Sequence, residues 1–491
     1  MHQITRIAAG VLLSAAVAGC AVGPDFKRPD APDVPGYTAN TPAPTVATPT
    51  EGGQSQRVNQ GQAVSAKWWT LFGSDALNTL VEEALKANPD LQSAKAALRA
   101  ARETLAAQKG GFFPALDAEH GSKRAQEANA IASPLSSNAN LYTLHTSQLA
   151  VSYTPDVFGG VRRQVESAAA QAEVARFEYE AAYLTLTSNV VNAAITEASL
   201  RAQVKATQEA VRVATQLLET TRKQQRAGLQ GGADVAAQEA ELAQVEATLP
   251  PLEKQLAQQR NLITVLAGRY PSEEIAQTFE LDTLHLPAAL PLSLPSELVE
   301  QRPDIRAAQA QLHAASAEIG VAKAARLPSI TLTGNIGSSA EGLRSLFTTG
   351  TGFWSLTGGL AMPLFRGGSL MHQQRAAEAT YDQAAAQYRS VVLAAFQNVS
   401  DTLHAIAADA RSLQSAHKAE QAARKSLGMA QRQLAAGMVG SPAVLQAQQA
   451  YQQALVTVVQ ARADRLTDSV ALLQALGGGW WNRDEQLAGN D

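Results

Sequence analysis

The sequence predicts a mainly α-helical fold with two pairs of strands, built from one structural unit that occurs twice. Three observations predict it. Short proline and glycine motifs recur about 210 residues apart, a spacing too long for a solenoid repeat. Each copy contains long stretches free of helix breakers. Each copy also contains two short segments in which apolar and polar residues alternate, a pattern typical of strands.

The repeated motifs mark the same places in each copy. Asn88-Pro89-Asp90-Leu91 recurs as Arg302-Pro303-Asp304-Ile305, and Phe113-Pro114 as Leu327-Pro328. The corner Ala227-Gly228 recurs as Ala436-Gly437. The chain is therefore a duplicated half-domain. Each half is predicted to contain, in this order, a helix, a pair of strands, a long helix and a returning helix.

Residues 1–19 form a predicted signal peptide, because Arg6 precedes an apolar run too short to span a bilayer. The run ends in Val17-Ala18-Gly19-Cys20, small residues before the single cysteine of the chain. This arrangement resembles the site at which bacterial lipoproteins are cut and acylated, so Cys20 is the predicted lipidation site. Residue 22 is Val rather than Asp, which resembles the pattern of Gram-negative lipoproteins that are sorted to the outer membrane.

Composition excludes several classes of function. A net charge of −4 gives no support for nucleic-acid binding. After the signal peptide, no apolar run reaches the ~18 residues of a transmembrane helix.

Residues 20–66 carry seven prolines and are expected to form an extended leash that is not packed.

The leash is followed by the two repeats. The first, 67–270, is expected to hold strands at about 112–122 and 143–155 and a helical hairpin at about 161–268. The second, 301–477, is expected to hold strands at about 328–338 and 353–363 and a hairpin at about 369–477. Residues 271–300 form a connector with room for a short strand, and 478–491 form a C-terminal tail. Heptad spacing, as in Val392, Val399 and Ile406, predicts coiled-coil packing of the hairpins.

Four strands per chain predict an oligomer if the strands lie in a membrane. An open sheet edge in lipid leaves unpaired backbone groups that cost several kcal/mol each. The smallest known membrane barrels have about eight strands. Two chains would give eight strands and a filled interior, whereas three would give twelve and a pore.

The residues reached here resemble the lipoprotein branch of the TolC-type outer-membrane efflux proteins, the NodT/OprM group. The resemblance spans the whole mature chain in order. The motifs that carry it are Val22-Gly23-Pro24-Asp25, Trp68-Trp69 with Phe72, Arg302-Pro303-Asp304-Ile305-Arg306, Ala325-Arg326-Leu327-Pro328-Ser329, Pro363-Leu364-Phe365-Arg366-Gly367-Gly368 and Gly477-Gly478-Gly479-Trp480. It implies a homotrimer with a twelve-stranded barrel over an α-helical periplasmic tunnel. It also implies the role of exit duct in a tripartite pump, with a periplasmic adaptor and an inner-membrane transporter of the RND class as partners.

The resemblance places the two helical corners at the periplasmic tip, where the tunnel closes and the adaptor docks. Gly228 and Gly437 suit left-handed helix ends, and Asp234 and Ser441 suit N-caps of the returning helices. In a trimer each tip residue forms a ring of three, and charged rings select ions. Asp234 is the candidate acidic ring, because 443–450 contain no acid where the family often has one. The residues assigned to the gate and adaptor site are Arg226, Gly228, Asp234, Arg432, Gly437 and Ser441.

The sequence gives little support for an enzyme. The eight histidines are scattered, without metal-ligand spacing, and nucleophile or phosphate-loop motifs are absent. We therefore expect no catalytic residues, no metal and no cofactor beyond the lipid on Cys20. The expected function is passive, gated export of small toxic compounds through the outer membrane; the alternative is a lipid-anchored coiled-coil structural or adhesion protein. Trp354 and Tyr142 are candidates for interfacial aromatic belts or for ordinary packing.

Overall fold

The protein forms two compact units in a computed structural model that describes residues 21–130 and 138–483. The first unit comprises Met1–Arg28, Arg99–Val174 and Ala308–Tyr388. The second comprises Pro29–Leu98, Ala175–Ala307 and Arg389–Asp491. Each unit thus takes segments from both repeats. The predicted signal peptide and Cys20 lie outside the described residues.

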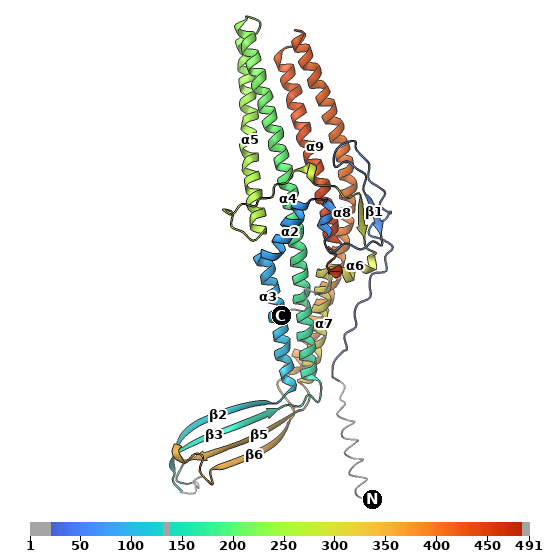
Figure 1. Ribbon diagram of the computed structural model, residues 1–491. Helices are drawn as coiled ribbons and strands as arrows, with labels where there is room; N and C mark the ends of the chain where they lie inside the picture. The colour runs from blue at the N-terminus through green and yellow to red at the C-terminus, as the bar shows by residue number, and fades with distance from the viewer. Residues whose placement is uncertain (1–20, 131–137, 484–491) are drawn as a thin grey trace. The chain divides into compact units, whose positions relative to one another are not determined.

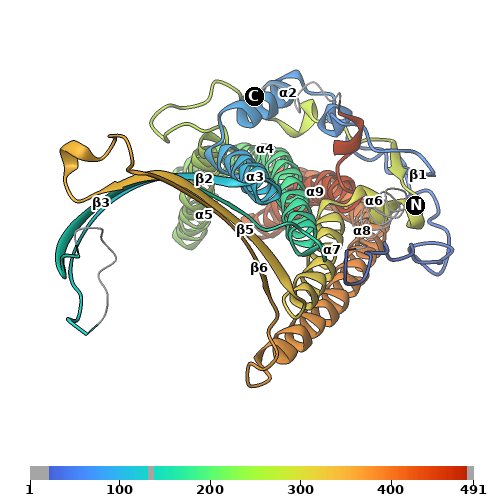
Figure 2. The same cartoon turned by 90° about the horizontal axis from the view of Figure 1, so that it is seen from below.

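One antiparallel sheet occupies the first unit and combines the strand pairs of both repeats. Its order is β2–β3–β5–β6, with β2 at Ala115–Gln126, β3 at Leu141–Tyr153, β5 at Ser329–Ala340 and β6 at Gly352–Ala361. Figure 2 shows that this sheet is curved. A short 3-10 helix, η4 (Leu343–Ser345), lies in the β5–β6 connection.

The strands begin and end up to four residues from their predicted bounds. β2 and β5 start immediately after Pro114 and Pro328, because proline has no N–H to donate to a ladder. The 3-10 helix η2 (Gly110–Phe112) occupies the predicted start of β2. At its other end β2 continues to Gln126, because Lys123 to Gln126 pair with the start of β3 despite their polarity.

Four helices contribute residues to both units: α3 (Pro89–Lys109), α4 (Gly160–Arg226), α7 (Pro303–Ala324) and α8 (Ser369–Ala435). α4 and α8 each have 67 residues, or ~100 Å of helix. Asn88 caps α3, since its Oδ1 accepts from the N–H groups of Asp90 and Leu91 at 3.0 and 3.1 Å. Among the described residues, none of the helices combines the length and hydropathy that a membrane crossing requires.

The second unit contains the returning helices α5 (Gly232–Leu266) and α9 (Ser441–Ala475), drawn as hairpins with α4 and α8 in Figure 1. The predicted seams are buried: Val399 and Leu413 on α8 and Val470 and Leu473 on α9 are each 0% exposed. Heptad spacing therefore located the helix contacts correctly, because residues three and four apart lie on one side of a helix.

A dense core lies around the segment that opens the first repeat. η1 (Trp68–Phe72) and α2 (Asp75–Ala87) supply side chains that are almost fully buried. In the second unit α4, α5, α6 (Pro295–Gln301) and α7 also carry fully buried apolar side chains. Burying each such side chain contributes about 1.5–3 kcal/mol. The largest of them are Trp68, Trp69, Phe72, Leu77, Leu80, Ile195, Ile263, Leu298 and Ile305.

Much of the predicted leash is packed, so the expectation for 20–66 was wrong. β1 (Arg57–Gln60) pairs in parallel with β4 (Ala289–Leu292) of the connector. Arg465 of α9 is 1% exposed and donates to the carbonyl oxygens of Gly52 and Gln54 at 2.6 and 2.9 Å. A buried guanidinium needs acceptors, and the extended backbone of this proline-rich segment supplies them.

The connector and the tail also pack within the second unit. Besides β4, the connector contains the 3-10 helix η3 (Leu281–Thr283) and α6. Arg302 donates to the carbonyl of Ala475 on α9 at 2.9 Å and pairs with Asp304 in the first turn of α7 at 2.7 Å, so it joins the ends of two helices. The tail forms η5 (Trp480–Asn482), whose Asn482 donates to Val64 O at 2.7 Å.

Candidate functional sites in the sheet and at the helical corners

Where the strands meet the helices, the sheet has one apolar and one polar face, because side chains alternate along each strand and the register aligns them across strands. Farther along, the same face as Leu149 carries polar pairs, His120 with Ser147 and Ser122 with His145. On the apolar face Leu149 lies opposite Ile336, and Ile336 opposite Trp354. These side chains are 46–77% exposed. The face also includes Leu116, Val151, Leu332, Leu356 and Leu360.

The opposite face is polar. Gln148 lies opposite Glu119 and donates to it at 2.7 Å, and Asn335 lies opposite Ser355. A continuous apolar face of this size, backed by a polar one, is typical of strands that separate lipid from water. Trp354 lies on the apolar face with 77% exposure, whereas Tyr142 is 8% exposed and donates to Glu127 at 3.0 Å.

Both helical corners have the same backbone geometry. Gly228 and Gly437 have φ of 73° and 71°, which confirms the predicted left-handed ends. Leu229 N donates to Gln224 O and Met438 N donates to Gln433 O, each at 2.9 Å. These are Schellman motifs, which satisfy carbonyl groups that the helix end leaves free.

The predicted N-caps of the returning helices were wrong by one and three positions. The N-caps are Gly231 and Gly440, whose backbones are extended, and Ser441 and Asp234 lie inside the helices. Asp234 still satisfies a free donor, because its Oδ2 accepts from Gly231 N at 3.1 Å. Ser441 is 1% exposed, and its Oγ has no hydrogen-bond partner within the described part of the chain.

The remaining corner residues are exposed. Arg226 and Arg432 lie in the last turns of α4 and α8, where a cation opposes the negative end of the helix dipole. Leu229 and Met438, at equivalent corner positions, are 74% and 68% exposed. The corners thus present cationic and apolar side chains at their ends.

The two hairpins contact each other below their corners. A small cluster of Ala430, Val444 and Ala447 packs against Leu217 of α4. Gln449 of α9 donates to Glu241 of α5 at 2.5 Å. Sequence reasoning assigned no role to these residues, whose types are common on any helix surface.

A pair of carboxyl groups was also missed. Asp409 of α8 shares a hydrogen bond with Asp468 of α9, and burial together with this bond raises the pKa of Asp409 to about 7. Burial also raises the pKa of Asp468. In the sequence, Asp464 and Asp468 lie one turn apart, which places two carboxyl groups on the same side of α9. That Asp468 contacts Asp409 on α8 is visible only in the structure.

Comparison with known proteins gives consistent matches over the whole chain. The family described as "Outer membrane efflux protein" matches residues 80–269 and 294–478, one match in each repeat. The chain is 31% identical over 470 residues to the "Antibiotic efflux pump outer membrane protein ArpC" of Pseudomonas putida, covering 95% of this chain and 94% of that protein. It is 28% identical over 471 residues to the "Probable outer membrane lipoprotein SilC" of Salmonella typhimurium, covering 94% and 96%.

Solved structures agree with the fold. The chain is similar to the outer-membrane channel OprN, with a TM-score of 0.83 and 27% identity over 94% of this chain and all of that one. This likeness includes both the helices and the strands of the fold.

Proposed function

The chain belongs to the outer membrane efflux protein family and is the outer-membrane channel component of an efflux pump, and we propose that three copies close one barrel around a common pore. The protein resides in the outer membrane and extends into the periplasm, and it is a channel component rather than an enzyme. The fold is that of outer-membrane channels that combine a helical tunnel with a β-barrel. The alternative of a structural or adhesion protein is not supported by any of these relatives.

The amphipathic sheet with two open edges is the observation that carries the trimer proposal. β2 and β6 are its edge strands, and an edge exposed to lipid costs several kcal/mol for each unpaired group. Joining β6 of one copy to β2 of the next removes every edge. Twelve strands leave an aqueous lumen lined by the polar faces, whereas eight strands would be filled by side chains.

The helical corners are the proposed gate and adaptor site. Three-fold symmetry would turn Asp234 into an acidic ring beneath the exposed ends of the hairpins. Arg226 and Arg432 would offer cationic hydrogen-bond donors to a periplasmic adaptor, while Gly228, Gly437 and Ser441 would fix the corner backbone. Opening would consist of movement of the hairpins when the adaptor and an inner-membrane transporter engage.

Acylation of Cys20 is the proposed anchor. The motif that ends at Cys20 supports it, and one relative, SilC, is described as a lipoprotein. The proposed transporter is of the RND class. The cargo class that we propose is small toxic compounds, because the name of the relative ArpC refers to antibiotics.

The trimer is tested by gel electrophoresis of a detergent extract with and without boiling. A barrel shared by three chains should migrate as a heat-sensitive trimer, and a monomer before boiling would contradict it. Purified protein in a planar bilayer should conduct ions at a low resting level.

The gate is tested in the same bilayer with Asp234→Asn. Asparagine can still accept from Gly231 N, so the corner is kept while the charge is removed. We expect reduced cation selectivity, seen as a shift in reversal potential under a salt gradient. Asp234→Glu, which keeps the charge, is the matched control. Equal selectivity in Asp234→Asn and the wild type would eliminate the acidic ring.

A further inference from the structure

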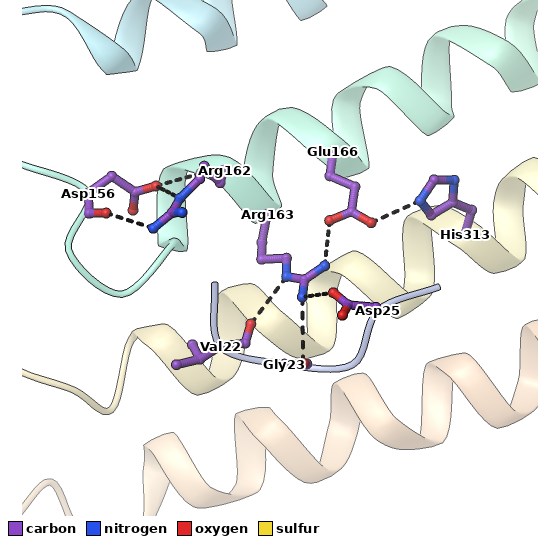
Figure 3. A network of polar contacts seen from close by, with 8 residues as sticks. All are labelled: Val22, Gly23, Asp25, Asp156, Arg162, Arg163, Glu166 and His313. Atoms are coloured by element: carbon purple, nitrogen blue, oxygen red, sulfur yellow. Dashed lines mark hydrogen bonds and ion pairs between the residues drawn. The ribbon is translucent and has the colours of Figure 1, made fainter. Parts of the chain in front are cut away.

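The segment that follows Cys20 is bound in a built site in the first unit, although its composition suggests a free leash. Figure 3 shows Arg163, near the start of α4, directed at this segment. Arg163 Nε donates to Val22 O at 3.2 Å, and Nη2 lies 2.8 Å from Asp25 Oδ1. Val22 N in turn donates to Phe158 O at 3.0 Å. Arg163 itself is only 4% exposed.

A second row of contacts holds Arg163 in place. Its Nη1 donates to Glu166 Oε2 at 2.7 Å, and Glu166 Oε1 lies 2.9 Å from His313 Nε2 on α7. His313 stacks on Phe26 with ring centroids 4.3 Å apart and planes at 13°. Glu166 therefore orients both side chains that contact the N-terminal segment (Figure 3).

Three glycines make room for the segment. A Cβ on Gly159 would lie 2.5 Å from Ala21 Cα, and one on Gly320 of α7 would lie 2.6 Å from Arg163 Cγ and 2.9 Å from Val22 O. Gly23 has φ of 108°, a conformation that favours glycine, and its own Cβ would lie 2.5 Å from Gly320 Cα. The backbone of the segment passes within contact distance of two helices because these three positions lack side chains.

The site is present in one repeat only. Counting from Gly159-Gly160 and Gly367-Gly368, the residue equivalent to Arg163 in the second repeat is Met371, which is 38% exposed. A duplicated chain has two such positions but a single N-terminus. A guanidinium is costly to bury unless its donors are satisfied. Because only the first repeat has a buried arginine at this position, we relate Arg163 to the N-terminal segment that it contacts.

We propose that Arg163, Glu166 and His313, with the glycines Gly159 and Gly320, form an intramolecular docking site for residues 21–26. Docking sets Ala21, the residue after Cys20, against the junction between β3 and α4. The consequence rests on the proposed acylation of Cys20: docking holds Ala21, the residue that follows the acylated cysteine, at this junction and so favours insertion of the strands as a trimer.

The first test is hydrogen exchange of the Val22 amide in the purified, detergent-solubilised protein. Arg163→Gln should speed this exchange by on the order of 10-fold or more, because hydrogen bonds to a charged group are lost. Arg212→Gln is the matched control, since Arg212 lies on the same helix, α4, and donates to Glu209. Unchanged exchange in Arg163→Gln would overturn the docking site.

A second variant keeps the proposal testable if Arg163→Gln does not fold. Gly320→Ala favours the helix but places a methyl group against Arg163 and Val22, so it should also speed Val22 exchange. Gly428→Ala in α8 is its control, because the nearest atom to its added Cβ is 3.7 Å away. Asp25→Asn should change the exchange about threefold or less, because the Asp25 side chain is 93% exposed.

Two further readouts separate docking from acylation. Incorporation of labelled palmitate reports acylation, and Cys20→Ser should abolish the label yet leave Val22 protected. If the wild type takes up no label, the proposed acylation fails while docking stands. If Arg163→Gln is acylated normally and yields as much heat-sensitive trimer as the wild type, the proposed effect of docking on insertion is overturned.

Discussion

Single glycines set the geometry of the helical corners. Gly228 and Gly437 have positive φ, and the sequence predicted both because each follows a long stretch of helix-forming residues. The cap positions of Asp234 and Ser441 were predicted wrongly, because glycines at 231 and 440 take the extended conformation that an N-cap needs. A glycine cap leaves no side-chain signal in the sequence.

Replacing these glycines should destabilise the hairpins. Gly228→Ala and Gly437→Ala should each cost about 1–2 kcal/mol, because an L-residue is strained in the left-handed region. The measurement is the midpoint of thermal loss of the helical circular-dichroism signal. Gly428→Ala, inside α8, should instead raise the midpoint slightly. A lowered midpoint for all three variants would contradict the argument from φ.

The carboxyl pair gives the second unit a pH dependence of stability. Asp409 has an ordinary pKa of 3.8 and a folded-state pKa of about 7, raised by burial and by its bond to Asp468. Because the folded state holds the proton more tightly, the stability that this group contributes is present at low pH and is lost as the pH rises from about 4 to 7.

Asp409→Asn should remove much of this dependence. The variant should be more stable than the wild type at pH 8, by about 1–2 kcal/mol after allowance for partial solvent exposure, and show little difference at pH 5. Thermal midpoints measured at both pH values provide the check. Asp401→Asn on the exposed side of α8 is the control. A wild type that gains stability between pH 5 and 8 relative to Asp409→Asn would refute this assignment.

At the scale of elements, the two returning helices differ although they are copies. α5 contains Pro250 and Pro251, whereas the equivalent positions in α9 are Val459 and Gln460. Two adjacent prolines remove the donors that would bond the carbonyls of Glu246 and Ala247, and each ring crowds the preceding turn. α5 is therefore the weaker of the two helices at its middle.

Giving α5 the residues of its counterpart should strengthen it. Pro250→Val with Pro251→Gln should slow amide exchange in residues 243–252 and stabilise the helix by about 1–3 kcal/mol per proline. Exchange in α9 serves as the internal reference. Equal exchange in the double variant and the wild type would show that packing, not the prolines, sets the local stability.

At the scale of the whole molecule, the two faces of the sheet should respond oppositely to charge. Leu356→Arg places a cation on the apolar face and should cost about 2–4 kcal/mol in a bilayer, so the yield of heat-sensitive trimer should fall. Ser355→Arg, one residue away on the polar face, should insert normally. Equal yields from the two variants would contradict a lipid-facing assignment of Leu356.

The sequence by itself determined the duplication, the long helices, their buried seams, the four strands and the left-handed corners. Each of these depends on local preferences. Proline and glycine break helices, heptad spacing places apolar residues on one side of a helix, and alternation places apolar and polar residues on opposite faces of a strand. Only the tertiary structure decided how the N-terminal segment packs, which strand pairs with β4, and that Asp409 meets Asp468. The contact between Gln56 and Ser469 joins residues 413 positions apart. Such contacts depend on which surfaces the fold brings together, and individual polar residues carry no local signal of a distant partner.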